Sequence, residues 1–312
     1  MGAPARTPRA GVLRALAVRA DPAQDQGMAK HDHGGLRARL RVPPGAGPVR
    51  LATYDTSVTP GLSGGKRRAQ AEIETMRQRL AGLQERLFAQ STAGDRRRLL
   101  LVLQGMDTSG KGGTVKHVVA GLNPAGLRIQ AFKAPTEQER AHSFLWRIRR
   151  ALPEPGQIGV FDRSHYEDVL IVRVHDLVPA VTWHGRYTTI NDFERSLADD
   201  GCTLVKVFLH IGYREQRARL LSRLDDPDKH WKFNPADVEE RSRWPAYQEA
   251  YEAVLERCST DVAPWYLVPA DRKWYRNWAI SRLLVEHLEE IAPAYPTADF
   301  DVSEARARLL AT

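Results

Sequence analysis

The chain has 312 residues, 42% of them hydrophobic, which is enough to bury one large α/β core or two small ones and excludes a wholly disordered chain. No apolar run approaches the roughly 20 residues that cross a bilayer, so we expect neither a membrane span nor a membrane partner. Of the eight net positive charges, five lie in residues 1–47, and the small excess that remains does not imply a nucleic-acid partner.

Residues 1–47 are rich in Pro, Gly, Ala and Arg and have no sustained apolar period, so we expect them to form a disordered tail. The sequence leaves open whether the chain begins at Met1 or at Met28, because the Arg-rich start only weakly resembles a targeting peptide. We expect residues 48–295 to form one domain and residues 296–312 to form a C-terminal tail.

Apolar residues recur at helical steps from Ala69 to Leu87, which predicts a long helix that packs against the domain rather than a coiled coil. Five short apolar segments follow, separated by helical stretches: residues 99–103, 129–132, 158–161, 204–211 and 265–268. The first holds five consecutive aliphatic residues, as in a strand covered on both faces. This alternation predicts one doubly wound α/β domain, a parallel sheet flanked by helices. Together with the loop after the first strand, it makes the expected fold P-loop kinase-like.

The segment after the first predicted strand has the glycine and lysine frame of a P-loop, G-x-x-x-x-G-K, and a helical pattern follows it. Glycines allow backbone amides to approach phosphate oxygens, and the lysine adds a positive charge at a helix N-terminus. The predicted phosphate-binding residues are Gly105, Gly110, Lys111, Gly112, Gly113 and Thr114.

Two aspartates are candidate metal ligands. Gly112 stands where a P-loop usually carries the Ser or Thr that binds Mg²⁺, and Asp107 within the loop is the obvious substitute. Asp162 ends the strand at 158–161, which is the Walker B position, and Arg163 follows it. We expect the two carboxylates to hold Mg²⁺, or Mn²⁺ in its place, and Arg163 to neutralise charge on the transferred group. The structural alternatives are an Asx turn at Asp107 and an ordinary ion pair at Asp162.

Residues 214–235 are expected to form a helical lid. Arg219 and Arg223 are four residues apart and therefore share a helical face, as arginines that close over a phosphoryl group require. Without the P-loop, a solvated helix would be the better interpretation. Lys229 and Lys232 follow in the same segment as candidate phosphate-binding residues.

Four motifs, in one order, resemble the polyphosphate kinase 2 family between about Gly64 and Leu288. They are G-M-D-T-S-G-K-G-G from Gly105, F-D-R-S-H-Y-E-D-V-L from Phe161, Q-x-x-R-x-x-x-R-x-x-D-P-x-K-x-W-K from Gln216, and A-P-W-Y-x-V-P-A-D from Ala263. The resemblance implies phosphoryl transfer between inorganic polyphosphate and a nucleotide. It also implies Mg²⁺ at Asp107 and Asp162, phosphates at Lys111 and Arg163, and a lid that carries Arg219 and Arg223.

The residues after Asp162 indicate which nucleotide accepts the phosphoryl group. Family members that use nucleoside diphosphates tend to read S-W-Y-N at this point, and those that accept monophosphates read S-H-Y-E. The run Ser164-His165-Tyr166-Glu167 matches the second kind, so the resemblance implies AMP, and often ADP, as acceptor and places Glu167 in the nucleotide site. Reversal of the reaction would use ATP, and guanine nucleotides are a further candidate.

Polyphosphate carries about one negative charge per residue, so a donor chain must meet cations along its length. Lys133, Arg147, Arg149 and Arg150 are candidates, with a solvated helix end as the alternative. The resemblance also implies a homo-oligomer, a dimer or a tetramer. Two cysteines without disulfide or zinc spacing, Cys202 and Cys258, favour a reducing, cytoplasmic location.

Two other functions remain open. An ATP-dependent nucleotide or nucleoside kinase could use the same P-loop scaffold, although it would be expected to have Ser or Thr after the loop lysine. A non-catalytic binding protein with a decayed site is the second alternative. The joint presence of both acids, the lysine and both lid arginines argues against it.

Overall fold

Five parallel strands form the centre of the domain in the computed structural model, which describes residues 35–45 and 47–312. The strands are β1 (Arg98–Gln104), β2 (Leu127–Ala131), β3 (Ile158–Asp162), β4 (Cys202–His210) and β5 (Trp265–Pro269), in the spatial order β2-β3-β1-β4-β5. Each strand expected from the sequence is confirmed, and its ends differ from the prediction by no more than two residues.

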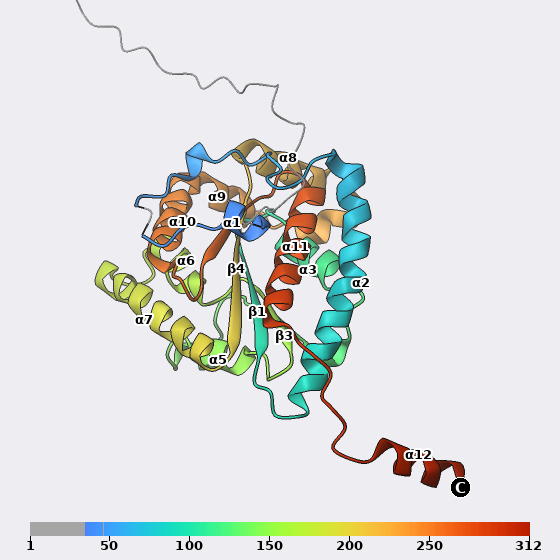
Figure 1. The fold of residues 1–312 in the computed structure, drawn as a ribbon. Helices are drawn as coiled ribbons and strands as arrows, with labels where there is room; N and C mark the ends of the chain where they lie inside the picture. The colour runs from blue at the N-terminus through green and yellow to red at the C-terminus, as the bar shows by residue number, and fades with distance from the viewer. Residues whose placement is uncertain (1–34, 46) are drawn as a thin grey trace, which may run out of the picture. The chain divides into compact units, whose positions relative to one another are not determined.

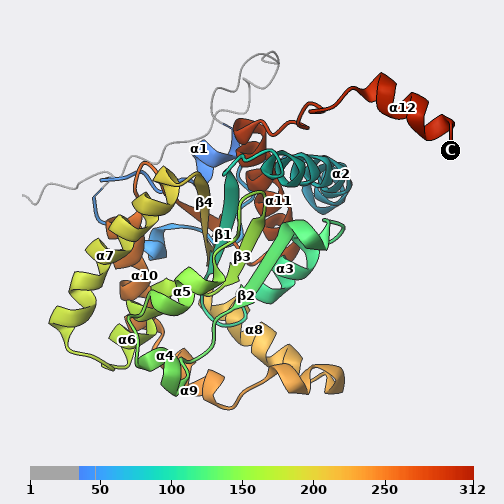
Figure 2. The same ribbon diagram turned by 90° about the horizontal axis from the view of Figure 1, so that it is seen from below.

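Helices cover both faces of this sheet (Figure 1, Figure 2). One face packs against α1 (Leu36–Leu40), α2 (Gly65–Ser91), α3 (Lys111–Val118) and α11 (Lys273–Ile291). The opposite face packs against α5 (Trp146–Ala151), α6 (Ile171–Val174), α7 (Ala180–Asp199) and α10 (Trp244–Cys258). The fold is therefore the expected α/β sandwich of helices around a parallel sheet.

The central strand β1 contributes side chains to both layers. Leu99, Leu101 and Leu103 lie in the hydrophobic cluster under α2 and α11, and all are fully buried. Leu100 and Val102 lie in the cluster under α7 and α10 and are equally buried. Successive side chains of a strand point to opposite faces, so a strand between two helical layers must be apolar at every position.

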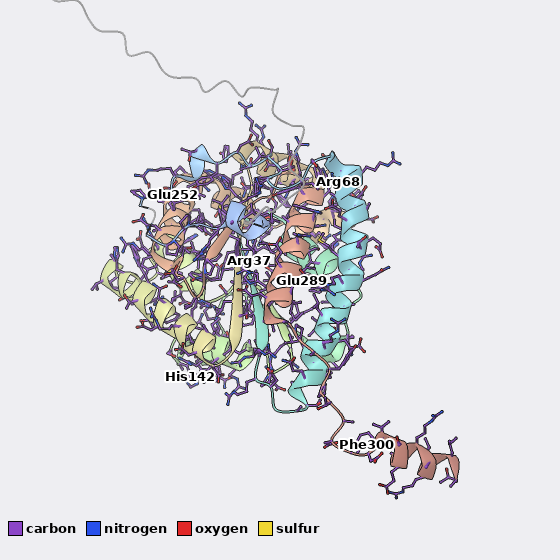
Figure 3. The ribbon with its side chains drawn as sticks, in the orientation of Figure 1. Arg37, Arg68, His142, Glu252, Glu289 and Phe300 are labelled. Atoms are coloured by element: carbon purple, nitrogen blue, oxygen red, sulfur yellow. The ribbon has the colours of Figure 1, made fainter. Side chains whose placement is uncertain are left out.

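Helix α2 packs on the domain as its apolar periodicity predicts. Ala69, Met76 and Leu80 are among its buried residues, and they belong to the same cluster as the interior of α11. An ion pair between Arg79 of α2 and Glu289 of α11, 2.9 Å long, joins the two helices at the surface. Figure 3 labels Glu289 on α11.

The expectation of a disordered tail through residue 47 is wrong for residues 35–45. Helix α1 buries Leu36 and Leu40 against the α11 layer, and the amide of Val42 donates to the carbonyl of Trp265 over 2.8 Å. A five-residue helix in a Pro- and Gly-rich segment is too short to give a periodic signal. Residues 1–34 and 46, the rest of the predicted tail, lie outside the described residues.

The remaining elements are short or peripheral. They are η1 (Leu51–Thr53), η2 (Pro124–Gly126), α4 (Glu137–Arg140), η3 (His165–Asp168), α8 (Tyr213–Leu224), η4 (Pro227–Lys232), α9 (Ala236–Ser242) and α12 (Val302–Leu310). Helix α12 lies in the predicted C-terminal tail and has no buried residue. Within the described part of the chain, no helix combines the length and the apolar character that a membrane crossing requires.

Candidate active site at the carboxyl ends of β1 and β3

The loop between β1 and α3 adopts a backbone that requires glycine at two positions. Gly105 has φ +152° and Gly110 has φ +106°, and both angles are unfavourable for other residues. A Cβ atom on Gly105 would lie 2.8 Å from the carbonyl oxygen of Leu209, and one on Gly110 would overlap the guanidinium of Arg276. The loop therefore lies tightly between β4 and α11 with its amides at the N-terminus of α3.

Lys111 begins α3 and turns back over the loop. Its Nζ donates to the carbonyl oxygen of Gly105 over 2.7 Å, and burial together with the positive charge of Arg163 lowers its pKa. Ser109 Oγ and Thr114 Oγ1 are buried without a hydrogen-bond partner. The loop thus has unused donors and an amine that an anion would stabilise in the charged form.

Asp107 and Asp162 line one pocket of about 400 Å³ together with Lys111 and Arg163. They meet there because β1 and β3 are neighbours, with Leu103 in register with Asp162. A Cβ on Gly112 would lie 3.7 Å from Asp162 Oδ2, so the position that replaces the usual Ser or Thr faces this carboxylate.

The two carboxylates form a sparse set of candidate metal ligands. Across the residues that the structure describes, no cluster of three or more His, Cys, Asp or Glu side chains is suited to a metal ion. Mg²⁺ keeps several waters and is commonly held by one or two carboxylates together with substrate phosphates. A pocket with two aspartates beside a loop predicted to bind phosphate fits such an ion.

Arg163 is held in the pocket by its backbone and by Asp107. Its φ of +66° is rare for a residue with a side chain, and its amide donates to the carbonyl oxygen of Leu103 over 3.0 Å. Its Nη2 donates to Asp107 Oδ1 over 3.0 Å. Burial alone would lower its pKa, but the carboxylates of Glu167 and Asp107 outweigh burial and raise it. The guanidinium is therefore a fixed positive charge beside Asp107, a candidate metal ligand.

Glu167 lies on the 3₁₀ turn η3 at the same end of the sheet. With the Gln104 amide turned so that its nitrogen faces this residue, that nitrogen donates to Glu167 Oε1 over 3.1 Å. Burial raises the pKa of Glu167, while Arg163 and Lys111 oppose the increase. Burial and the charge of Glu167 also raise the pKa of Tyr251, which places this tyrosine of α10 in the same environment.

The two predicted lid arginines have different positions. Arg223 lines the pocket that holds Asp107 and Asp162, and it donates to the carbonyl oxygen of Lys232 over 2.8 Å. Arg219 is buried instead against the protein side of the P-loop. Its guanidinium donates to the carbonyl oxygens of Thr108, Ser109, Ala270 and Asp271 and to the carboxylate of Glu215.

Of the predicted lysines, Lys133 lines the pocket, whereas Lys229 and Lys232 do not. Lys229 pairs with Asp226 over 2.5 Å, and Lys232 lies 4.8 Å from the ring centroid of Trp231. The other cations predicted to line the path of the polyphosphate chain contact carbonyl oxygens or aromatic rings of the protein. Arg147 donates to the Lys133 carbonyl, and Arg149 and Arg150 lie over the rings of Phe193 and Trp146.

Sequence reasoning missed three residues that shape the site. Arg276 of α11 is 3% exposed and donates to the carbonyl oxygen of Ser109 over 3.2 Å. Gln216 donates to the carbonyl oxygen of Asp107 over 3.2 Å, and Asp237 pairs with Arg223 over 3.3 Å. Gln216 is the first residue of the third motif, so its place in that motif could have identified it as a site residue. Arg276 and Asp237 have no local pattern that distinguishes them from ordinary helix residues.

Comparisons with known proteins show the family to which the chain is similar. The model of the family "Polyphosphate kinase 2 (PPK2)" matches residues 64–295. An AMP/ADP-polyphosphate phosphotransferase of Meiothermus ruber is 48% identical over 258 residues, which cover 83% of this chain and 95% of that protein. An ADP-polyphosphate phosphotransferase of Rhodopseudomonas palustris is 42% identical and covers 80% and 88%. The crystal structure of polyphosphate kinase 2 from Arthrobacter aurescens TC1 matches with a TM-score of 0.86 at 47% identity, covering 89% of this chain and 97% of that one.

Proposed function

Because this chain belongs to the polyphosphate kinase 2 family, we propose that it transfers phosphoryl groups between inorganic polyphosphate and adenine nucleotides, with AMP and ADP as acceptors. The single observation that carries the proposal is the joint lining of one pocket by Asp107, Lys111, Asp162, Arg163 and Arg223. An anion-binding loop, two carboxylates and two arginines are what transfer of a phosphoryl group requires.

We propose that Asp107 and Asp162 hold Mg²⁺, with Mn²⁺ as a substitute. Two carboxylates leave most of the coordination sphere to water and phosphate oxygens, which is the usual arrangement for Mg²⁺ at a phosphate site. When bound, the ion would neutralise charge on the phosphates and so reduce their repulsion from the aspartates.

The protein side chains would act by position and charge. Lys111 would exchange the carbonyl of Gly105 for a phosphate oxygen of the donor, and the loop amides would bind further oxygens. Arg163 and Arg223 would stabilise the negative charge that spreads over the transferred group. A phosphate oxygen of the acceptor attacks the terminal phosphorus, and the bond to the bridging oxygen of the chain breaks. Both nucleophile and leaving group are anions, so no general base is required.

Glu167 is proposed to contact the acceptor. It matches the motif of monophosphate-accepting members, and a relative at 48% identity is named for both AMP and ADP. Burial raises its pKa, so it takes up the proton that lets it donate to a phosphate oxygen more readily than an exposed glutamate does. Guanine nucleotides as acceptors, a dimeric or tetrameric assembly and a cytoplasmic location belong to the same proposal.

The test uses purified protein with AMP, Mg²⁺ and long-chain polyphosphate and no nucleoside triphosphate. Ion-exchange chromatography should detect ADP and then ATP as AMP is consumed. Formation of ADP only when ATP replaces polyphosphate would favour the ATP-dependent kinase. Absence of transfer from either donor would favour a binding protein.

A further inference from the structure

A fully buried ion pair lies on the face of the sheet that packs against α7. Lys206 of β4 and Glu194 of α7 are both 0% exposed, and Lys206 Nζ donates to Glu194 Oε2 over 2.6 Å. The same amine donates to the hydroxyl of Tyr166 over 2.8 Å and to the carbonyl of Cys258 over 2.6 Å. All three donors of the ammonium group are therefore satisfied, yet no step of the proposed transfer uses this lysine.

The other oxygen of Glu194 binds two consecutive residues of the turn η3. Oε1 accepts from the Tyr166 hydroxyl over 2.8 Å and lies 3.2 Å from His165 Nε2. Both side chains are fully buried, and the ring of Tyr166 packs edge-on against Trp265 with 4.8 Å between centroids. The next residue along the turn is Glu167, whose side chain interacts with Arg163 and Lys111 in the site.

Stability alone does not account for this arrangement. Burial of two charges carries a desolvation penalty, and a well-packed apolar pair of similar volume is often as stable or more so. Burial opposes ionisation of Glu194, but Lys206 and the hydrogen bond from His165 outweigh it and lower the pKa of this carboxyl. Charged hydrogen bonds are short and directional, so the pair fixes the orientation of the groups it binds more closely than apolar contacts would.

We propose that Lys206 and Glu194 are positioning residues for acceptor selection: through Tyr166 and His165 they fix the turn that presents Glu167 to the nucleotide phosphate. The inference rests on the proposed function, because it assumes that Glu167 contacts the acceptor. It extends that function by assigning the choice between a monophosphate and a diphosphate to a buried network outside the pocket.

The variant Tyr166→Phe tests this role because it removes the hydroxyl shared by both charges and keeps the ring. We expect kcat/KM for AMP to fall by about tenfold, mainly through KM, and kcat/KM for ADP to fall by less than about threefold. The KM for polyphosphate should not change. The matched control is Tyr266→Phe, which removes a buried hydroxyl that bonds to His287 over 2.9 Å in the other layer. It should leave the AMP to ADP ratio unaltered.

Two further measurements separate positioning from a structural role. In a Glu167→Gln background, Tyr166→Phe should have no additional effect on AMP, because the residue that it positions has already been changed. The double variant K206M/E194M removes both charges together and should reproduce the loss for AMP, which covers the case that Tyr166→Phe does not fold. Equal loss for AMP and ADP, or full additivity with Glu167→Gln, would overturn the inference.

Failure of the proposed function gives a different result. In that case, the wild-type protein would transfer no phosphoryl group from polyphosphate, although calorimetry could still detect AMP binding. The affinity for AMP then tests the positioning role. Tyr166→Phe should lower this affinity about tenfold, and Tyr266→Phe should not change it. Equal AMP affinity in both variants would overturn the positioning role independently of catalysis.

Discussion

Arg219 Nη1 lies 2.9 Å from the carbonyl oxygen of Thr108, so a buried arginine of α8 supports the P-loop from the protein side. The same guanidinium donates to the carbonyl oxygens of Ala270 and Asp271, both over 2.7 Å, and thereby ties the loop to the end of β5. Arg276 lies close by, and burial together with the charge of Arg219 lowers its pKa to about 10. The loop is thus built on two cations that do not line the pocket, whereas Lys111, Lys133, Arg163 and Arg223 do.

The variants Arg219→Met and Arg223→Met should therefore behave differently. Removal of Arg219 leaves several buried carbonyls unpaired and should lower the free energy of unfolding by about 2–4 kcal/mol. Removal of Arg223 should change that free energy by less than about 1 kcal/mol but lower kcat about 100-fold. Urea unfolding and steady-state kinetics measure the two effects. Equal stability of both variants would contradict the structural role of Arg219.

Asp107→Asn and Asp162→Asn should each lower kcat by orders of magnitude while the circular dichroism spectrum stays that of the folded protein. Electron paramagnetic resonance of Mn²⁺ should detect weaker binding in both variants in the presence of polyphosphate. The control is Asp200→Asn, since Asp200 pairs with Arg98 over 2.6 Å just before β4 and lies outside the pocket. Near-normal turnover of either variant would remove that aspartate from the metal site.

Glu167→Asn should lower kcat/KM for AMP more than for ADP, by about tenfold in the ratio of the two. The expected reason is loss of a carboxyl group that contacts the shorter acceptor. Glu154→Gln is the control, because Glu154 is exposed and lies 3.8 Å from Arg128 on the surface. Parallel losses for AMP and ADP in Glu167→Asn would show that this residue does not select the acceptor.

The buried network predicts a specific pH dependence of stability. The pKa of Glu194 is lower in the folded protein than its ordinary value of 4.5, so its ionisation stabilises the fold above pH 4.5. As the pH falls below that value, the unfolded chain takes up the proton first and the contribution is lost. The free energy of unfolding of Glu194→Gln should therefore be lower than that of the wild type by a constant amount between pH 7 and pH 5. This difference should become smaller at lower pH. A difference that grew on acidification would contradict the ionised state of Glu194.

Local sequence patterns predicted the strands of the sheet and the closeness of the P-loop to Asp162. A strand of five consecutive aliphatic residues, 99–103, must be covered on both faces of the sheet. The P-loop follows this strand and Asp162 ends another, so the two lie close together if the strands are neighbours. The register of Leu103 with Asp162 satisfies that condition. The strand predictions hold because each depends on the residue types within a single segment, whereas the meeting of the two site segments depends on β1 and β3 being neighbours.

Long-range contacts account for what the sequence did not predict. Arg219 and Arg223 share a helical face, yet Arg219 is buried behind the loop because the carbonyls of Thr108 and Ala270 meet it there. Lys206 lies within an apolar strand, and its partner Glu194 belongs to a different helix. No spacing rule connects such residues, since their contact depends on how α7 and β4 pack.

Donor preference tests the central claim most directly. We would measure kcat/KM for long-chain polyphosphate and for ATP as phosphoryl donors, with AMP as acceptor and Mg²⁺ at a fixed concentration. We expect a clear preference for polyphosphate, together with a steep loss of its kcat/KM as salt is raised, as for other polyanions. A higher kcat/KM for ATP than for polyphosphate would contradict the proposed function.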